Sequence, residues 1–229
     1  MKLYHGTSVT FLSQRLRYGI RPRKNRPSNW HKAPSHPEMV YLTTAYPFYY
    51  ATMNPKERRC VVFEIDAARL DERRLYPDED YLFHRMLQRD GKTPTREQHR
   101  RLCADLDLFQ RLWSNSLARL GNCAYLGTIP RRAITRYCHF DSALRPELAS
   151  YCMDASISFA NYEQQGKQFE KVVAWFFGDR KVLPMVAEAE TAEERQFWVA
   201  QSKDRTGIEV VELRQPSAVQ PLQSDARAT

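Results

Sequence analysis

Residues 3–7 read LYHGT, and they stand almost at the start of the chain. We expect a short strand over Lys2–His5 that leads directly into His-Gly-Thr. Histidine is a poor residue for a structural turn, but its ring nitrogens bind hydroxyl groups well. Glycine lets a ligand approach the backbone closely. His5 is therefore either part of a binding site or an ordinary polar residue near the amino terminus.

The residues after this motif predict a helix, a long basic loop and a second strand. Thr10–Tyr18 has helical apolar spacing, and Gly19 follows at the position that commonly ends a helix. Residues 21–39 form a Pro-rich loop, and loops of this length are usually functional or disordered. The stretch VYLTT at 40–44 belongs to a strand over Met39–Thr43, followed by a short aromatic helix over Tyr46–Met53.

Strands and helices then alternate irregularly to the end of the chain. CVVFEID at 60–66 is the clearest strand, and the acidic cluster YPDEDY at 76–81 lies beyond it. This mixed order favours an α+β fold. Further helices are expected at Glu79–Gln88, from Pro94 to Leu120, at Asn161–Phe177 and after the Thr191–Glu194 capping box; further strands are expected at Ala124–Ile129, Ala133–Phe140, Lys181–Ala187 and Gly207–Leu213.

The pattern changes near residue 145 and again near 214, which predicts three parts. Residues 1–144 form the core, residues 145–214 form a C-terminal α/β extension packed on it, and the polar, Pro-containing tail 215–229 is expected to be disordered.

Charge and cysteine content limit the class of protein. The 229 residues include 35 Lys and Arg against 27 Asp and Glu, a net charge of +8, which favours an anionic partner such as nucleic acid or marks a merely basic protein. The five cysteines and six histidines show neither disulfide-scaffold nor metal-site spacing, so no metal is expected. Neither a signal peptide nor a membrane span is apparent, and a reduced cytoplasmic protein is expected.

Three motifs in this order resemble the ADP-ribosyltransferase superfamily, in the branch with a His–Tyr–acid triad that includes diphtheria toxin and the poly(ADP-ribose) polymerases. They are LYHGT, the Gly19-Ile20 pair after the first helix, and the tyrosine in VYLTT. The resemblance covers residues 3–66 well and reaches about residue 140 more loosely. It implies a split β-sheet core and the use of NAD⁺ as co-substrate, without a metal.

The resemblance assigns roles to individual residues. His5 is expected to bind the adenosine-side ribose, the backbone of Gly6 to hold the nicotinamide amide, and Tyr41 to stack on the nicotinamide ring. Tyr49 or Tyr50 would supply the other side of this sandwich. The cofactor set also includes Thr7, Arg21 and Arg23, of which the arginines are expected near the pyrophosphate. Tyr41 as a core aromatic residue is the alternative.

The acid of the triad is the point at which the chain departs from the family pattern. Neither late strand carries a Glu or Asp at its head. Asp78, Glu79 and Asp80 stand where the rifampicin-modifying relatives place an aspartate, and we expect Asp80 to be the acid, with Asp78 next. Glu64 is a third candidate, although alternation predicts a solvent-facing position for it.

Basic residues outside the motifs predict a nucleic-acid contact surface. Its expected members are Arg26, Trp30, Lys32, Arg131 and Arg132, and dispersed solvated charge is the alternative.

The sequence therefore predicts a transferase that moves ADP-ribose from NAD⁺ to a nucleic acid and acts as a toxin in a toxin–antitoxin or phage-defence system, with an antitoxin as a possible protein partner. Three alternatives stay open. The enzyme could hydrolyse NAD⁺ or modify a protein, the fold could be a degenerate binding module without an acid, or the chain could be an interaction protein that uses mainly residues 145–213.

Overall fold

The computed structural model describes residues 1–24, 35–53, 58–92, 95, 97–98, 101, 105–141, 162–181, 183, 186, 189–203 and 208–213. Seven strands form one sheet in the order β4-β5-β2-β1-β3-β6-β7, and every neighbouring pair is antiparallel. The strands are β1 (Lys2–Ser8), β2 (Met39–Thr43), β3 (Arg59–Asp66), β4 (Leu75–Pro77), β5 (Asn122–Leu126), β6 (Ile134–Asp141) and β7 (Glu209–Glu212).

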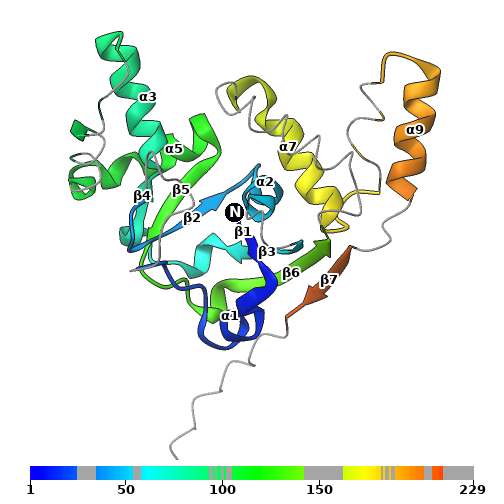
Figure 1. The fold of residues 1–229 in the computed structure, drawn as a ribbon, viewed down its shortest axis with the longest axis horizontal. Coiled ribbons are helices and arrows are strands. Elements are labelled where there is room, and N and C mark those ends of the chain that lie inside the picture. Colours follow the sequence, from blue (N-terminus) through cyan, green and yellow to red (C-terminus); the bar gives the residue numbers. More distant parts are fainter. Residues whose placement is uncertain are drawn as a thin grey trace, which may run out of the picture.

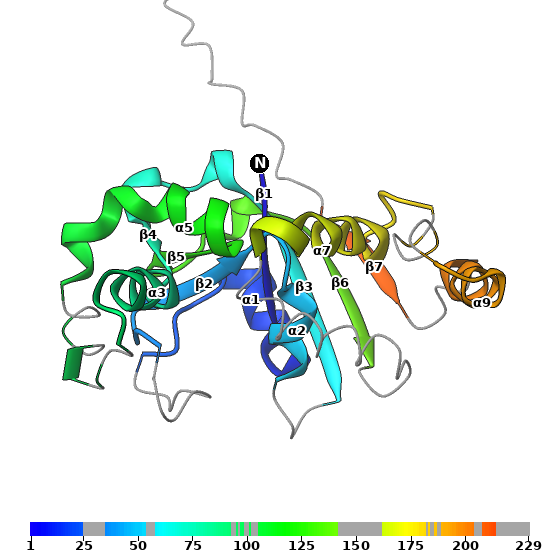
Figure 2. The same cartoon turned by 90° about the horizontal axis from the view of Figure 1, so that it is seen from above.

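Helices cover both faces of this sheet, which confirms the α+β class. The α-helices are α1 (Leu12–Tyr18), α2 (Pro47–Thr52), α3 (Glu79–Asp90), α5 (Trp113–Leu120), α7 (Tyr162–Phe176) and α9 (Ala192–Lys203). Short 3₁₀ segments are η1 (Val9–Phe11), η2 (Ala67–Arg69), η3 (Glu72–Arg74), η4 (Leu106–Leu112) and η5 (Arg131–Ala133). Figures 1 and 2 show α1 on the opposite side of the central strands from α2 and α7, with α9 standing apart beyond β7.

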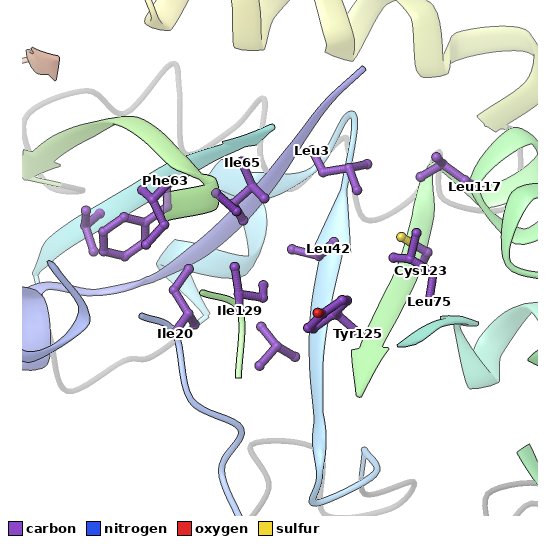
Figure 3. Packing of buried hydrophobic residues seen from close by; sticks show 14 residues of the cluster. Leu3, Ile20, Leu42, Phe63, Ile65, Leu75, Leu117, Cys123, Tyr125 and Ile129 are labelled. Carbon is purple, nitrogen blue, oxygen red and sulfur yellow. The ribbon is translucent and has the colours of Figure 1, made fainter. Parts of the chain in front are cut away.

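Two apolar clusters hold these layers together. The first lies on the α1 side and includes Leu3, Leu42 and Phe63, as Figure 3 shows. The second lies under α2 and α7 and includes Val62 and Trp175. Alternate residues of β3 enter each cluster, so this strand is buried on both faces, as a central strand is expected to be.

This double burial corrects the solvent-facing position that alternation predicted for Glu64. The side chain is 4% exposed, because α7 and the turn after it cover that face of the sheet. A strand pattern reports which residues share a face, but it does not report whether a distant helix covers that face.

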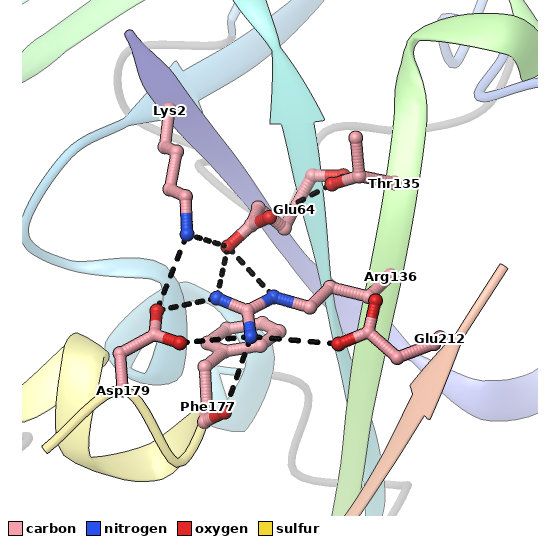
Figure 4. Close-up of polar contacts among 7 residues, drawn as sticks. All are labelled: Lys2, Glu64, Thr135, Arg136, Phe177, Asp179 and Glu212. Carbon is pink, nitrogen blue, oxygen red and sulfur yellow. Dashed lines mark hydrogen bonds and ion pairs between the residues drawn. The ribbon is translucent and has the colours of Figure 1, made fainter.

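Glu64 and Arg136 form the centre of a buried ionic cluster, shown in Figure 4. Arg136 Nη2 and Nε donate to Glu64 Oε2 at 2.6 and 2.9 Å. Arg136 also binds Asp179, just after α7, and its guanidinium lies 4.9 Å from the centre of the Phe177 ring. Lys2 Nζ lies 3.2 Å from both Glu64 and Asp179. The cluster thus ties β1, β3 and β6 to the end of α7.

Several predicted elements differ from the structure. β1 runs on to Ser8, and Leu75–Pro77 pairs with β5 where no strand was expected. The single helix expected from Pro94 to Leu120 is interrupted: Glu97, Gln98 and Arg101 are helical, Asp105 lies in a turn, and η4 and α5 follow. The strand expected at 181–187 is absent at its described positions, of which Val186 is helical. The domain boundary predicted at residue 144 falls outside the described residues and stays a prediction.

Replacing Glu64 by Gln tests the ionic cluster. Arg136 is buried and would lose one of its two main carboxylate partners, so the free energy of unfolding should fall by about 3 kcal/mol. Lys2→Ala is the matched control, since Lys2 is 52% exposed, and its loss should stay within about 1 kcal/mol. Urea unfolding at pH 7 measures both variants, and equal losses would contradict the central role of the Arg136–Glu64 pair.

Candidate functional site

The sheet opens between β1 and β2 at the HGT motif. β1 pairs with β3 along its whole length, from Lys2 to Ser8. Its one register partner on β2, within the described chain, is Thr43 opposite Tyr4. Figure 1 shows β1 and β2 running apart beyond this point. The side chain of His5 spans the start of the opening, with its Nδ1 2.9 Å from the carbonyl oxygen of Tyr41.

The surroundings of His5 determine the protonation state and the tautomer of its imidazole. Burial lowers the pKa of His5 to about 4, and the charge of Arg15 adds to the lowering. The imidazole is therefore neutral near pH 7. A carbonyl only accepts hydrogen bonds, so Nδ1 carries the proton and donates to Tyr41. Nε2 is then left as an acceptor, suited to a hydroxyl donor.

Arg15 holds the end of β1 beside His5. Its Nη1 donates to the carbonyl oxygen of Ser8 at 2.7 Å, and its Nη2 donates to Thr7 Oγ1 at 3.1 Å. The third residue of the HGT motif therefore accepts a hydrogen bond from α1. This places a guanidinium close to His5 without any signal in the motif itself.

Gly6 is required by close packing between β1 and α2. A Cβ atom at this position would lie 1.8 Å from the carbonyl oxygen of Pro47 and 2.8 Å from the backbone nitrogen of Ala51. A non-glycine residue would force the strand and the helix apart. The glycine therefore has a packing role in addition to the ligand role expected for its backbone.

Tyr41 joins the opening to a buried carboxylate. The hydroxyl of Tyr41 donates to Glu79 Oε1. The backbone N–H of His36 donates to both, at 2.7 Å to the Tyr41 oxygen and 2.9 Å to Glu79. Burial, and then the charge of Glu79, raises the pKa of Tyr41 well above its usual value, so the phenol stays protonated. His5, Tyr41 and Glu79 thus form one connected chain of contacts.

Glu79 reaches Tyr41 because Asp78 caps the helix that follows. Asp78 Oδ1 accepts the backbone N–H of Asp80 at 2.9 Å, which makes Glu79 the first residue of α3. Glu79 is 4% exposed, and burial raises its pKa while the Tyr41 hydrogen bond opposes that rise. Burial, with the charges of Asp80 and Glu79, also raises the pKa of Asp78 well above its usual value.

A second polar chain supports the same corner of the fold. The backbone N–H of Asp78 donates to Ser116 Oγ at 3.0 Å, and that hydroxyl donates to the carbonyl oxygen of Asn122 at 2.8 Å. Asn122 Nδ2 donates to the Tyr50 hydroxyl at 2.8 Å. Burial raises the pKa of Tyr50 well above its usual value, so this phenol also remains neutral.

The structure brings some of the predicted residues together and separates others. Within the YPDEDY cluster, Glu79 makes the Tyr41 contact, whereas Asp78 caps α3 and the side chain of Asp80 is exposed. The choice between these acids as the catalytic group stays a prediction. Tyr49 and Tyr50 lie edge to face on α2, with ring centres 5.4 Å apart.

The predicted basic residues lie on two segments. Arg23 Nη2 donates to the carbonyl oxygen of Ser35, next to His36, whereas Arg21 is exposed beside Tyr18. Arg131 and Arg132 belong to η5. The remaining predicted nucleic-acid residues lie outside the described part of the chain: Arg26, Trp30 and Lys32.

Sequence reasoning missed several residues of this region, among them Arg15, Ser116 and Asn122. The sequence does carry a signal for the place of Glu79. Aspartate is a preferred N-cap residue, and Asp78 stands directly before the helix expected from Glu79. No local pattern marks the contacts of Ser116 with Asp78 and of Asn122 with Tyr50, since these partners lie far away along the chain.

The described residues show neither a metal-binding cluster nor a membrane-spanning helix. They hold no group of three His, Cys, Asp or Glu side chains placed to bind a metal ion. None of their helices is both long and apolar enough to cross a membrane.

Comparison with known proteins gives only distant structural likenesses. No protein-family model matches the chain, and no curated protein matches it. Among solved structures, a chain named EcPltA is similar over 61% of this chain and 75% of its own length, at 14% sequence identity and a TM-score of 0.35. Agreement of this extent does not establish a common fold.

The neutral state of His5 predicts a pH-dependent stability. The folded pKa of about 4 lies below the unfolded value of 6.5, so the unfolded chain binds more protons between these values. The contribution of His5 is complete above pH 6.5 and is lost as the pH falls towards 4. Between pH 7.5 and pH 5 the wild type should lose about 2 kcal/mol that His5→Asn does not lose.

Urea unfolding of both proteins at the two pH values measures this difference. Asparagine can still donate to the Tyr41 carbonyl, so the variant isolates the protonation effect. An equal loss in both proteins would mean that His5 is accessible and titrates normally.

Proposed function

We propose that this protein transfers ADP-ribose from NAD⁺ to a macromolecular acceptor and releases nicotinamide. The observation that carries the proposal is a chain of contacts that begins at the opening of the sheet. It runs from His5 Nδ1 to the carbonyl oxygen of Tyr41, and from the Tyr41 hydroxyl to the buried Glu79. These are the residue types of a His–Tyr–acid triad, and they come from LYHGT, VYLTT and the acidic cluster, whose resemblance to the superfamily was drawn from sequence.

The reaction breaks the bond between the ribose C1′ and the nicotinamide nitrogen. The bonding electron pair leaves with the neutral nicotinamide, and the ribose acquires oxocarbenium character, as in glycoside hydrolysis. An acceptor oxygen or nitrogen then forms a bond to C1′ and releases one proton. A protein that catalyses this reaction must stabilise positive charge at the ribose and accept that proton.

Glu79 suits both tasks. A carboxylate beside the ribose stabilises the developing positive charge, and a carboxyl whose pKa is raised by burial accepts a proton more readily than a solvated one. Tyr41 would pack on the nicotinamide, while its hydroxyl orients Glu79. His5 would offer its Nε2 lone pair to a ribose hydroxyl.

This arrangement favours a transferase over a degenerate binding module. A module that had lost its acid would have no carboxylate next to Tyr41. Glu79 stands in hydrogen-bond contact with Tyr41, whereas Glu64, the third candidate acid, is engaged by Arg136. We therefore assign the acid role to Glu79 in this proposal, in place of Asp80 or Asp78.

For the acceptor we propose nucleic acid. The net charge of +8 supports an anionic partner. Arg23, whose Nη2 lies at Ser35 next to His36, remains the proposed contact of the NAD⁺ diphosphate, whereas Arg21 lies over the exposed Tyr18 ring. The biological setting that we propose is a cytoplasmic toxin of a toxin–antitoxin or phage-defence system, held in check by an antitoxin.

Transfer of label from NAD⁺ tests the proposal. Purified protein is incubated with NAD⁺ labelled in its adenylate part, together with total RNA, genomic DNA or cellular protein. We expect label to move to nucleic acid, and nicotinamide release to fall about 10²–10⁴-fold in Glu79→Gln. Asp80→Asn, one residue away on the exposed side, should stay within about threefold of the wild type.

Each outcome has a distinct meaning. Full activity in Glu79→Gln with loss in Asp80→Asn would overturn the choice of acid. Label on protein, or nicotinamide release without transfer, would replace the acceptor by protein or by water. Absence of nicotinamide release with every acceptor would overturn the enzymatic proposal itself.

A further inference from the structure

An exposed tyrosine lies under two arginine side chains at the end of α1. Tyr18 is 49% exposed. The guanidinium carbon of Arg17 and that of Arg21 each lie 5.1 Å from the centre of this ring. A guanidinium held against an aromatic ring forms a flat, positively charged layer on which a base can stack.

Further arginines lie directly beside this layer. Ile20 and Ile129 form an isolated antiparallel bridge through backbone hydrogen bonds of 3.0 and 2.9 Å. The bridge sets the end of α1 next to η5, which carries Arg131 and Arg132. Gly19 packs closely against this segment: a Cβ atom at Gly19 would lie 3.2 Å from the backbone nitrogen of Arg131.

Among the described residues, no carboxylate neutralises the charges on this surface. In the described part of the chain, no carboxylate forms an ion pair with Arg17, Arg21, Arg131 or Arg132. Arg136 differs from them, because Glu64 and Asp179 bind it. Arg17, Arg21 and Arg132 are exposed and therefore available to phosphate groups. Arg131 is half-buried, and its Nη1 donates to the carbonyl oxygen of Ile134 at 3.2 Å.

We infer that this surface, made of Arg17, Tyr18, Arg21, Arg131 and Arg132, binds single-stranded nucleic acid. The arginines contact the phosphates, and an unpaired base stacks on the Tyr18–guanidinium layer. A duplex keeps its bases stacked on each other and would use the charges alone, so the exposed aromatic ring points to a single strand.

The position of the surface connects it to the opening of the sheet. α1 has seven residues, about 10 Å in length, and the same helix carries Arg15, which binds Thr7 and Ser8 of β1. A nucleic-acid strand bound at Tyr18 therefore lies close to the opening of the sheet that His5 spans. The claim that this surface docks the acceptor of the reaction rests on the proposed function. The claim that it binds single-stranded nucleic acid does not depend on that function.

Fluorescence anisotropy with a labelled oligo(U) strand tests the inference. We expect Arg17→Gln/Arg132→Gln to lower the affinity about tenfold and to reduce the slope of log K against log salt by about 1.4, which is about 0.7 for each lost phosphate contact. The matched control is Arg111→Gln/Arg180→Gln, which removes two exposed arginines elsewhere and should change the affinity less than twofold.

The tyrosine is tested separately from the charges. Tyr18→Ala should lower the affinity about tenfold at an unchanged salt slope, since the loss is one of stacking, and Tyr18→Phe should bind like the wild type. Thermal unfolding confirms that each variant is folded.

Three results would overturn the inference: equal losses in the two double variants, wild-type binding by Tyr18→Ala, or duplex DNA bound as tightly as oligo(U). Displacement of oligo(U) by an acidic peptide at equal charge concentration would assign the surface to a protein partner. Nicotinamide release is measured in parallel. Normal release with unaltered binding by the surface variants overturns this inference alone, whereas specific binding without release overturns the proposed function alone.

Discussion

The parting of β1 from β2 after Tyr4 is the constraint on which the candidate site depends. β1 stays paired with β3 throughout, so the opening arises on one edge of one strand. Gly6 allows α2 to pack against the same strand from the other face, which holds β1 in place while β2 diverges. The His5 ring then occupies the edge where backbone pairing stops, and its hydrogen bond to Tyr41 replaces part of the lost pairing.

Much of the fold could be predicted because its elements are local. The strands around Leu3, Tyr41 and Phe63 follow from alternation and from their flanking turns, and the helix stops at Gly19 and Gly121 follow from the conformation that glycine permits. The burial of Glu64 could not be predicted. It depends on α7, about a hundred residues later, and sequence spacing carries no information on which helix covers which face of a sheet.

The candidate site likewise has a part that could be predicted from sequence and a part that could not. His5 and Tyr41 lie in short motifs, and the structure places them in contact. The choice among three consecutive acids is different, because it depends on a rotation of about 100° per residue at the start of a helix. Once Asp78 caps α3, Glu79 faces Tyr41 and Asp80 faces away towards solvent. A one-residue change in where the helix begins would present another carboxylate.

Because α7 covers one face of the sheet, the core cannot be completed until late in synthesis of the chain. Translation proceeds at about 5–20 residues per second, so His5, Tyr41 and Glu79 leave the ribosome well before α7 is synthesised. Until then, the face of the sheet that contains Val62, Cys60 and Cys138 is covered by α2 without α7, and Arg136 has no Asp179. His5, Tyr41 and Glu79 are therefore present on an incomplete core, and the packing of this face is completed only when the last third of the polypeptide has been synthesised.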